Sequence, residues 1–520
     1  MAKNNKNGVS PPMFYRILSV FFCGKMKIGF DNDLYLKTQS EHIRERINKF
    51  GGKLYLEFGG KLFDDYHASR VLPGFMPDSK IRMLMQFGQD AEAIIVINAE
   101  DIVKKKIRKD FSVGYDLEVL RLVDMFLDRG IGVSGLVITH FNGQSEAEAF
   151  QKKAESNGLK VYRHYLIDGY PSNVDLIASD EGYGKNEFVP TTKPLVIVTA
   201  PGPGSGKMAV CLSQLYHEKK RGVQAGYAKF ETFPIWNLPL KHPVNIAYEA
   251  ATVDLGDVNM IDPYHLEAYG ETTVNYNRDI EIFPVVNAIL EGVLGSSPYK
   301  SPTDMGVNMA GNCIVDDEVV RKAANYEIIR RYYSTLRDRR EGRATADTLL
   351  KSEIYMKNAG ITPEYRKTVE TVKKVMGETE RPVVAAELDD GRIVTGKATP
   401  LTTASSSMML NMLKELAGID DSVTLISKEV IESVQRLKVD NLGYKNPRLH
   451  LDELLIALSI LARTDKNAEK AFSMLPKLRG CDVHSSVIIS VVDENVYKKL
   501  GMNISSEPEH QTKCLFHESF

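Results

Sequence analysis

The stretch of the sequence best suited to chemistry is APGPGSGKM, residues 200–208. It follows the apolar run LVIVT and precedes a predicted helix, the context in which glycine-rich loops bind phosphate. Glycines let successive backbone N–H groups face one anion, the helix N-terminus adds its dipole, and the lysine adds a positive charge. The residues predicted to bind the phosphate are Gly202, Gly204, Ser205, Gly206 and Lys207.

Two positions depart from the usual phosphate-binding loop. Pro201 stands where a glycine is expected, and Met208 stands where a hydroxyl group usually holds Mg²⁺. We therefore expect either that carboxylates elsewhere hold the metal or that the phosphate binds without a strongly held metal. The alternative is a glycine-rich turn that binds nothing.

Charged side chains lie at the end of the next predicted strand, VQAGYAKF at 223–230. This strand places Lys229 and Glu231 at its carboxyl end, which is where open α/β sheets bind their ligands. Together with Lys207 they form the predicted catalytic set.

Oxygen-rich side chains are dense between residues 254 and 308. Carboxylate oxygens suit Mg²⁺, whose remaining ligands are water and phosphate, and the predicted metal ligands are Asp254, Asp257 and Asp262. The polar segments NYNRDIE and SPTDMGVNMAGN are suited to hydrogen-bonding a small substrate. The predicted substrate-binding residues are Asn275, Asn277, Asp279, Ser301, Thr303, Asp304 and Asn308. Each of these residue types also serves as an ordinary cap or turn residue.

Short apolar runs alternate with amphipathic segments from Met26 onward, which predicts parallel βαβ units. Strands are expected at 53–58, 93–99, 132–141 and 160–167, and a helix at 207–220. MKIGFDND reads as a first strand and turn, and residues 1–25 as a non-native or disordered extension. Further on, Asp390-Gly391 predicts a hairpin turn, and the serines and threonines at 402–407 predict either a second anion site or ordinary helix capping.

The expected fold class is α/β, with mostly parallel, Rossmann-like or P-loop-like sheets flanked by helices and a smaller α+β C-terminal domain. A chain of 520 residues is too long for one hydrophobic core. The predicted domains are 26–190, an N-terminal α/β domain; 191–340, a P-loop-like domain with a long polar segment; and 341–520, the C-terminal domain.

The amino-acid composition argues against some classes of binding partner. The 66 Lys and Arg residues nearly balance the 68 Asp and Glu residues, so no overall field favours nucleic acid or an anionic membrane. The five cysteines form no C-x-x-C pair, which argues against a disulfide framework and favours the cytoplasm. No apolar stretch is long enough to span a membrane. We expect a small-molecule substrate and a homo-oligomer.

The segments TAPGPGSGKMAVCLSQLYHE, GYAKFETFPIWNLPLKHPVN and YKSPTDMGVNMAGNCI closely resemble a family of uncharacterised bacterial proteins, from Met26 nearly to the C-terminus. Some members carry the label ATP-dependent zinc protease. This sequence does not support that activity, because His217-Glu218 is followed by Lys219, Lys220 and Arg221 and the second histidine of H-E-x-x-H is missing.

A remoter resemblance is to P-loop enzymes such as dethiobiotin synthetase, CTP synthase and formyltetrahydrofolate ligase, in which ATP activates an oxygen before an amine attacks. The resemblance implies that Lys207 contacts the β and γ phosphates, that Lys229 faces the transferred phosphate, and that Asp254 or Asp257 holds Mg²⁺. These families keep a serine or threonine where Met208 stands, which leaves the metal assignment open.

Three functions follow as expectations. The first is an ATP- and Mg²⁺-dependent enzyme performing phosphoryl transfer or phosphate-activated ligation on a small polar metabolite. The second is a regulator that binds a nucleotide or phosphometabolite without turnover. The third is an enzyme that acts on a phosphorylated small molecule without ATP.

Overall fold

The computed structural model describes residues 28–59, 61–108 and 113–511, so the predicted N-terminal extension at 1–25 lies outside the described residues. The chain forms two compact units, Gly29–Arg366 and, in its described part, residues 367–511. This division differs from the predicted boundaries at 190 and 340. The physical reason is strand order, because strands from both sides of residue 190 interleave in one sheet.

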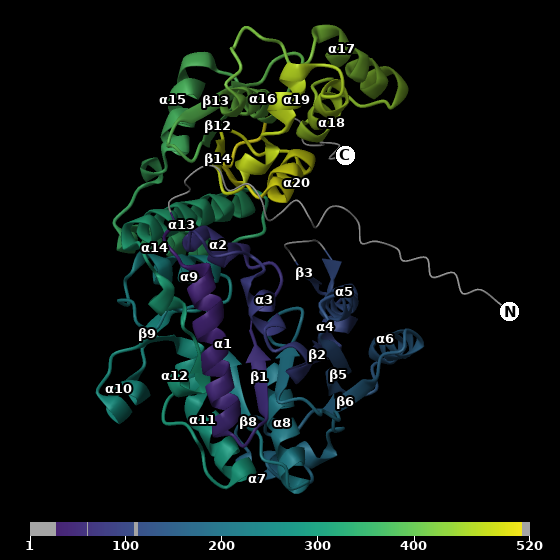
Figure 1. Ribbon diagram of the computed structural model, residues 1–520, viewed down its shortest axis with the longest axis vertical. Coiled ribbons are helices and arrows are strands. Elements are labelled where there is room, and N and C mark those ends of the chain that lie inside the picture. The colour runs from purple at the N-terminus through teal and green to yellow at the C-terminus, as the bar shows by residue number, and fades with distance from the viewer. Residues whose placement is uncertain (1–27, 60, 109–112, 512–520) are drawn as a thin grey trace, which may run out of the picture. The chain divides into compact units, whose positions relative to one another are not determined.

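A seven-stranded, all-parallel sheet forms the centre of the first unit (Figure 1). β7 inserts between β1 and β2, which precede it in sequence, so strands distant in the chain pair directly. The observed architecture confirms the expected α/β class. In spatial order the strands are β11 (Gly306–Val307), β8 (Gly226–Phe230), β1 (Leu54–Phe58), β7 (Leu195–Thr199), β2 (Ala91–Asn98), β5 (Gly132–Phe141) and β6 (Val161–Tyr165).

The two faces of this sheet pack against different helices. Alternating residues such as Tyr55, Val196 and Tyr227 form one apolar core with α8 (Lys207–Lys220), α11 (Asn277–Leu294) and α7 (Val174–Ile177). Further helices pack against the strands and one another and complete the layers. They are α1 (Asn32–Lys49), α2 (Tyr66–Val71), α3 (Ser79–Met85), α4 (Ala99–Val103), α5 (Tyr115–Leu127) and α6 (Ser145–Ser156).

The predicted first strand at MKIGFDND is wrong within its described part. Phe30 makes only an isolated bridge to Ile314. The Asp31 carboxylate accepts a hydrogen bond from Leu34 N at 2.9 Å, and α1 begins at Asn32. Asp31 is therefore the N-cap of α1, because an aspartate before a helix satisfies one of the N–H groups that the first turn leaves unpaired.

The chain after β8 folds into helices and two short strands before and after it returns to the sheet. Two small strands, β9 and β10, pair antiparallel, and the segment returns to the sheet at β11. The elements are α9 (Pro243–Ala251), β9 (Asn259–Ile261), α10 (Pro263–Tyr269), β10 (Val274–Tyr276), α12 (Pro302–Met305), α13 (Asp317–Arg340) and α14 (Ala346–Ala359).

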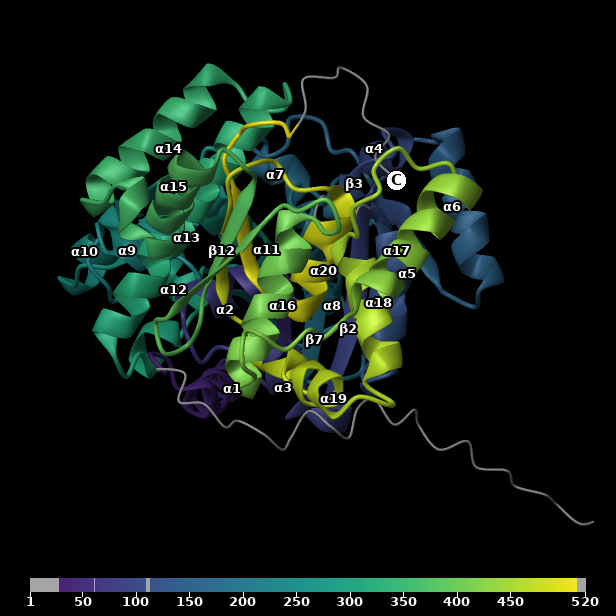
Figure 2. The ribbon, with the colours of Figure 1, turned by 90° about the horizontal axis from the view of Figure 1, so that it is seen from above.

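The second unit contains a four-stranded mixed sheet in the order β13-β12-β14-β15, with helices α15, α16 and α20 packed against its strands and α18 packed against α16 and α20 (Figure 2). β12 and β13 form the predicted hairpin around Asp390-Gly391, and Gly391 adopts a φ of +85°. The strands are β12 (Val383–Glu387), β13 (Ile393–Lys397), β14 (Asp482–Ser485) and β15 (Asn503–Ser506); the helices are α15 (Lys367–Thr379), α16 (Ala404–Ala417), α17 (Lys428–Arg436), α18 (Leu451–Leu461), α19 (Lys466–Phe472) and α20 (Val491–Leu500). Within the described residues, no helix has the length and apolarity needed to cross a membrane.

Candidate functional site

The glycine-rich loop connects β7 to α8 at the carboxyl edge of the parallel sheet. Gly204 and Gly206 adopt φ values of +77° and +85°, which side chains other than glycine rarely adopt. Two neighbouring strand ends hold the loop in place. Thr139 Oγ1 donates to the Ser205 carbonyl at 2.7 Å, and Asn98 Nδ2 donates to the Gly204 carbonyl at 3.2 Å. The carbonyls of the loop are thus tied to β5 and β2.

The N–H groups of the loop are, by contrast, available. Within the described part of the chain, no hydrogen bond is donated by the backbone N–H of Gly204, Ser205, Gly206 or Lys207. Four successive donors at the start of a 14-residue helix form a concave site of positive potential. This geometry supports the predicted use of these residues as an anion site.

Lys207 adds an ammonium group to the same place. Its Nζ donates to Ser205 Oγ at 3.4 Å, and no carboxylate of the described residues lies within 4.0 Å of it. Burial lowers the pKa of Lys207, while the negative charge of Glu57 opposes that shift. A partly buried lysine without a close counter-ion is suited to an anionic ligand.

Two other loop positions have structural roles. A Cβ built on Gly202 would lie 2.1 Å from the Tyr115 hydroxyl, so the loop passes directly against that ring. The Met208 side chain packs against the apolar core of the sheet and α8. The position where related loops supply a hydroxyl group to Mg²⁺ therefore contributes to packing.

A row of residues crosses the sheet beside this loop. Val198 on β7, Glu57 on β1, Lys229 on β8 and Gly306 on β11 are in register with one another. Paired residues of neighbouring parallel strands point to the same face, so Glu57 lies between the loop strand and Lys229. Glu57 is buried and accepts a hydrogen bond from Tyr227 OH at 2.7 Å. The sequence indicated a strand here but not that its glutamate faces the site.

Lys229 is the centre of a buried polar cluster. Its Nζ lies 2.9 Å from Glu231 Oε1 and also contacts the Asp279 carboxylate and the Tyr276 hydroxyl. Burial alone would lower the pKa of Lys229, but the charges of Asp279 and Glu231 hold it well above its usual value. Lys229 is therefore a charged residue whose contacts are already taken by protein groups.

Glu231 has the most unusual protonation in this cluster. Burial, together with the negative charge of Asp279, raises the pKa of Glu231 to about 8 against the lowering effect of Lys229. Tyr276 OH donates to Glu231 Oε1 at 3.4 Å. A carboxyl group that titrates near neutral pH at the edge of a parallel sheet is a candidate general acid or base.

The three predicted metal ligands do not come together. Asp257 lies 2.6 Å from the guanidinium of Arg278, Asp262 accepts from the backbone N–H groups of Tyr264 and His265, and Asp254 is exposed. Across residues 28–511, apart from the short undescribed gaps, no three His, Cys, Asp or Glu side chains are grouped to hold a metal. Asp257 and Asp262 instead pair with protein groups of the segment that follows β8.

Most predicted substrate-binding residues also form hydrogen bonds within these loops. Asp279 alone among them belongs to the Lys229 cluster. The partners of the others are protein groups: Asn308 with Pro234 O, Asn277 with Val258 N, Ser301 with His265 and Asp304 N, Thr303 with Asp262 and Asn275, and Asp304 with Tyr269 OH. These hydrogen bonds hold the loops around the candidate site in place.

Aromatic side chains border the cluster, and their role was not apparent from the sequence. Tyr276 lies 6.3 Å, centroid to centroid, from Tyr248, whose ring stacks on Phe233. The centre of the Tyr276 ring also lies 4.5 Å from Lys229 Nζ, so this aromatic side chain contributes to the burial of the cluster.

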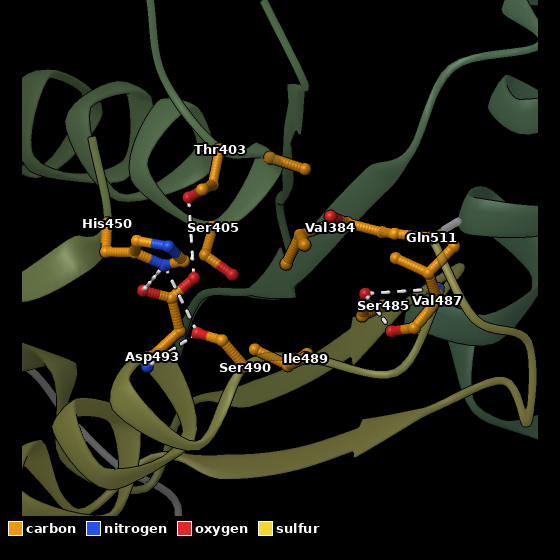
Figure 3. Close-up of a pocket in the computed structure, with 11 residues that line it drawn as sticks. Val384, Thr403, Ser405, His450, Ser485, Val487, Ile489, Ser490, Asp493 and Gln511 are labelled. Atoms are coloured by element: carbon orange, nitrogen blue, oxygen red, sulfur yellow. Dashed lines mark hydrogen bonds and ion pairs between the residues drawn. The ribbon is translucent and has the colours of Figure 1, made fainter. Parts of the chain in front are cut away.

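A small pocket in the second unit contains the predicted second anion site (Figure 3). Thr403, His450 and Ser490 cap the N-termini of α16, α18 and α20 around it. The Asp493 carboxylate already lies among these termini, accepting from Leu451 N at 2.7 Å and from Thr403 Oγ1 at 3.4 Å. Because a buried carboxylate supplies the negative charge here, helix capping explains these residues better than an external anion.

His217 and Glu218 also form structural contacts. His217 Nε2 lies 2.8 Å from the Asn186 carbonyl, and Glu218 accepts from Tyr55 OH at 2.7 Å and contacts Lys53. Neither side chain is arranged as a zinc ligand with a second histidine.

Comparison with known proteins shows what this chain is similar to. Residues 28–360 match the family model described as domain of unknown function DUF1846, N-terminal, and residues 364–516 match its C-terminal counterpart. The UPF0371 protein DIP2346 of Corynebacterium diphtheriae is 56% identical, covering 94% of this chain and 99% of the relative. The UPF0371 protein str1377 of Streptococcus thermophilus is 51% identical with the same coverage. These matches show that the chain belongs to the DUF1846 family of proteins of unknown function.

Proposed function

We propose that this protein is an enzyme that acts on a small phosphorylated molecule. The loop between β7 and α8 binds the phosphate group, and Glu231 transfers a proton on the neighbouring part of the substrate. The observation that carries this proposal is the set of four unpaired backbone N–H groups beside Lys207, an ammonium group with no carboxylate close to it.

The electrostatic layout supports separate roles for the two lysines. Lys207 has no close counter-ion and is suited to the phosphate. Lys229 is neutralised by Asp279 and Glu231, and in the proposal it orients these carboxyl groups and stabilises the ionised form of Glu231. Because Glu231 has a pKa of about 8, it exchanges a proton readily near neutral pH.

ATP is the second candidate ligand, favoured by the spacing of the glycines and Lys207 in the loop. The residues present do not fit a resident Mg²⁺ bound by protein carboxylates, because Met208 supplies no hydroxyl and Asp254, Asp257 and Asp262 are held apart. An ATP-dependent reaction in this site therefore depends on a nucleotide that brings its own metal.

A ligand panel measured by isothermal titration calorimetry tests the proposal. We expect inorganic phosphate and phosphate monoesters to bind without Mg²⁺, and Lys207→Ala to weaken that binding at least tenfold. Binding of ATP only, and only with Mg²⁺, favours the second candidate. Unchanged phosphate affinity in the Lys207→Ala variant rules out the loop as the phosphate site. Turnover of a bound monoester distinguishes an enzyme from a regulator that binds without reaction.

A further inference from the structure

Two buried polar atoms next to the Lys229 cluster lack hydrogen-bond partners. Glu231 Oε1 contacts Lys229 and Tyr276, but Glu231 Oε2 has no partner among the described residues, and neither has Trp236 Nε1. Folded proteins leave few buried polar atoms unpaired, and such atoms usually contact a water molecule or a ligand. Glu231 itself is only 5% exposed, so bulk solvent does not satisfy its carboxyl group.

Gly306 brings these two side chains to the same place. Its backbone, with φ −79° and ψ 162°, suits any residue, so conformation does not require a glycine. A Cβ at this position would lie 2.4 Å from Trp236 Cζ2 and 3.4 Å from Glu231 Oε2. The missing side chain therefore lets the indole pack against the strand edge, and the Trp236 ring and Glu231 Oε2 both border Gly306.

We propose that this corner, formed by Glu231, Trp236 and Gly306, binds a hydroxyl group of the substrate. The inference rests on the proposed function, because it assumes that the phosphate of the same molecule lies at the loop. A hydroxyl group donates one hydrogen bond, to Glu231 Oε2, and accepts another, from Trp236 Nε1. An ammonium group has no lone pair for the indole N–H.

The separation of the two ends gives an upper limit to the length of the substrate. The loop follows β7, and Gly306 is on β11, so three strand spacings, roughly 14 Å in all, separate their backbones. Side chains from both ends shorten the gap that a ligand must bridge. The substrate class that fits is a phosphorylated sugar or polyol, with its phosphate at Lys207 and a hydroxyl group at the Glu231 corner.

Trp236 is the only tryptophan in the chain, so its fluorescence reports directly on this corner. We would titrate the full-length protein with glycerol 3-phosphate, ribose 5-phosphate and glucose 6-phosphate. The matched controls are propyl, pentyl and hexyl phosphate, which carry the phosphate without the hydroxyl groups. Calorimetry then gives the affinities of the wild type and of Trp236→Phe, which keeps an aromatic ring but removes the N–H.

The expected result is that at least one hydroxylated phosphate binds tenfold or more tightly than its alkyl counterpart and changes the Trp236 fluorescence. In Trp236→Phe that preference should fall to twofold or less, while affinity for inorganic phosphate stays the same. Equal affinities for hydroxylated and alkyl phosphates, or an undiminished preference in Trp236→Phe, overturn the inference but leave the phosphate site standing. Failure of every phosphate to bind, inorganic phosphate included, overturns the proposed function itself.

Discussion

Glu57 and Lys229 lie opposite each other on neighbouring strands β1 and β8, at the carboxyl edge of the parallel sheet. Glu57 is also in register with Val198 on β7, immediately before the glycine-rich loop. The charge of Glu57 opposes the lowering of the Lys207 pKa by burial and, after Asp279 and Glu231, contributes to the raised pKa of Lys229. One carboxylate therefore lies between the glycine-rich loop and the Lys229 cluster.

The proposed phosphate site depends on the left-handed backbone conformation of Gly204, which can be tested with a matched control. Gly204 in the loop and Gly143 after β5 have φ values of +77° and +73°, and a Cβ at either position would have no atom within 4 Å. Replacing either with alanine should cost about 1 kcal/mol of folding free energy, because the left-handed conformation strains a side chain. Only Gly204→Ala should weaken phosphate binding in calorimetry, and equal affinities in the two variants would argue against the loop.

The positive charge of Lys207 should contribute to phosphate affinity, whereas that of another lysine on α8 should not. Lys207→Met keeps an unbranched side chain but removes the charge, and we expect phosphate affinity to fall by about 10- to 100-fold, as for a lost charged hydrogen bond. Lys219→Met, at an exposed position of the same helix, is the control and should bind phosphate normally. A similar loss in both variants would show a general electrostatic effect.

Glu231 should make stability depend on pH. Its pKa is about 8 in the folded chain, against an ordinary value of 4.5, so the folded protein holds a proton that the unfolded chain releases between these values. The stability from this protonation is fully present below pH 4.5 and is lost as the pH rises through 8. Urea unfolding from pH 5 to 9 should show a smaller decline in Glu231→Gln than in the wild type, whereas Glu148→Gln, an exposed control on α6, should follow the wild type.

The partners of Lys229 should contribute unequally to stability. Asp279→Asn leaves a buried ammonium group with less compensation, and we expect a loss of about 3 kcal/mol in the free energy of unfolding. Tyr276→Phe removes one neutral hydroxyl group and should cost about 1 kcal/mol. Asp347→Asn, which breaks the exposed pair with Lys351, should cost less than about 1 kcal/mol. Equal losses for Asp279→Asn and Asp347→Asn in urea unfolding would show that the cluster is solvated.

Local sequence was sufficient to predict the elements that carry the site. The helix predicted at 207–220 and the strand predicted at 132–141 coincide with α8 and β5. Both were predictable because the spacing of apolar residues and the glycines at element ends are signals that extend over only a few residues. Strand order was not predictable, since the insertion of β7 between β1 and β2 depends on pairings between distant segments.

The same limit explains which site residues were missed. Glu57 is locally an unremarkable strand residue, and only the register of β1 with β8 brings it to Lys229. Conversely, Asp262, Ser301 and Thr303 are caps and turn partners, because short oxygen side chains serve capping and ligand binding equally well. Sequence pattern alone does not separate these two uses.

Asp493 should stabilise the second unit through its charge. This buried carboxylate accepts from Leu451 N at the start of α18 and from the Thr403 hydroxyl at the start of α16 (Figure 3). Asp493→Asn keeps the shape but loses the negative charge that the helix N-termini favour, and we expect a loss of about 2 kcal/mol. Asp465→Asn, at the exposed cap of α19, should be nearly neutral because asparagine caps about as well as aspartate. Hydrogen exchange of peptides covering α18 and α20 in the full chain measures the difference, and equal protection in both variants would show that the charge of Asp493 is dispensable.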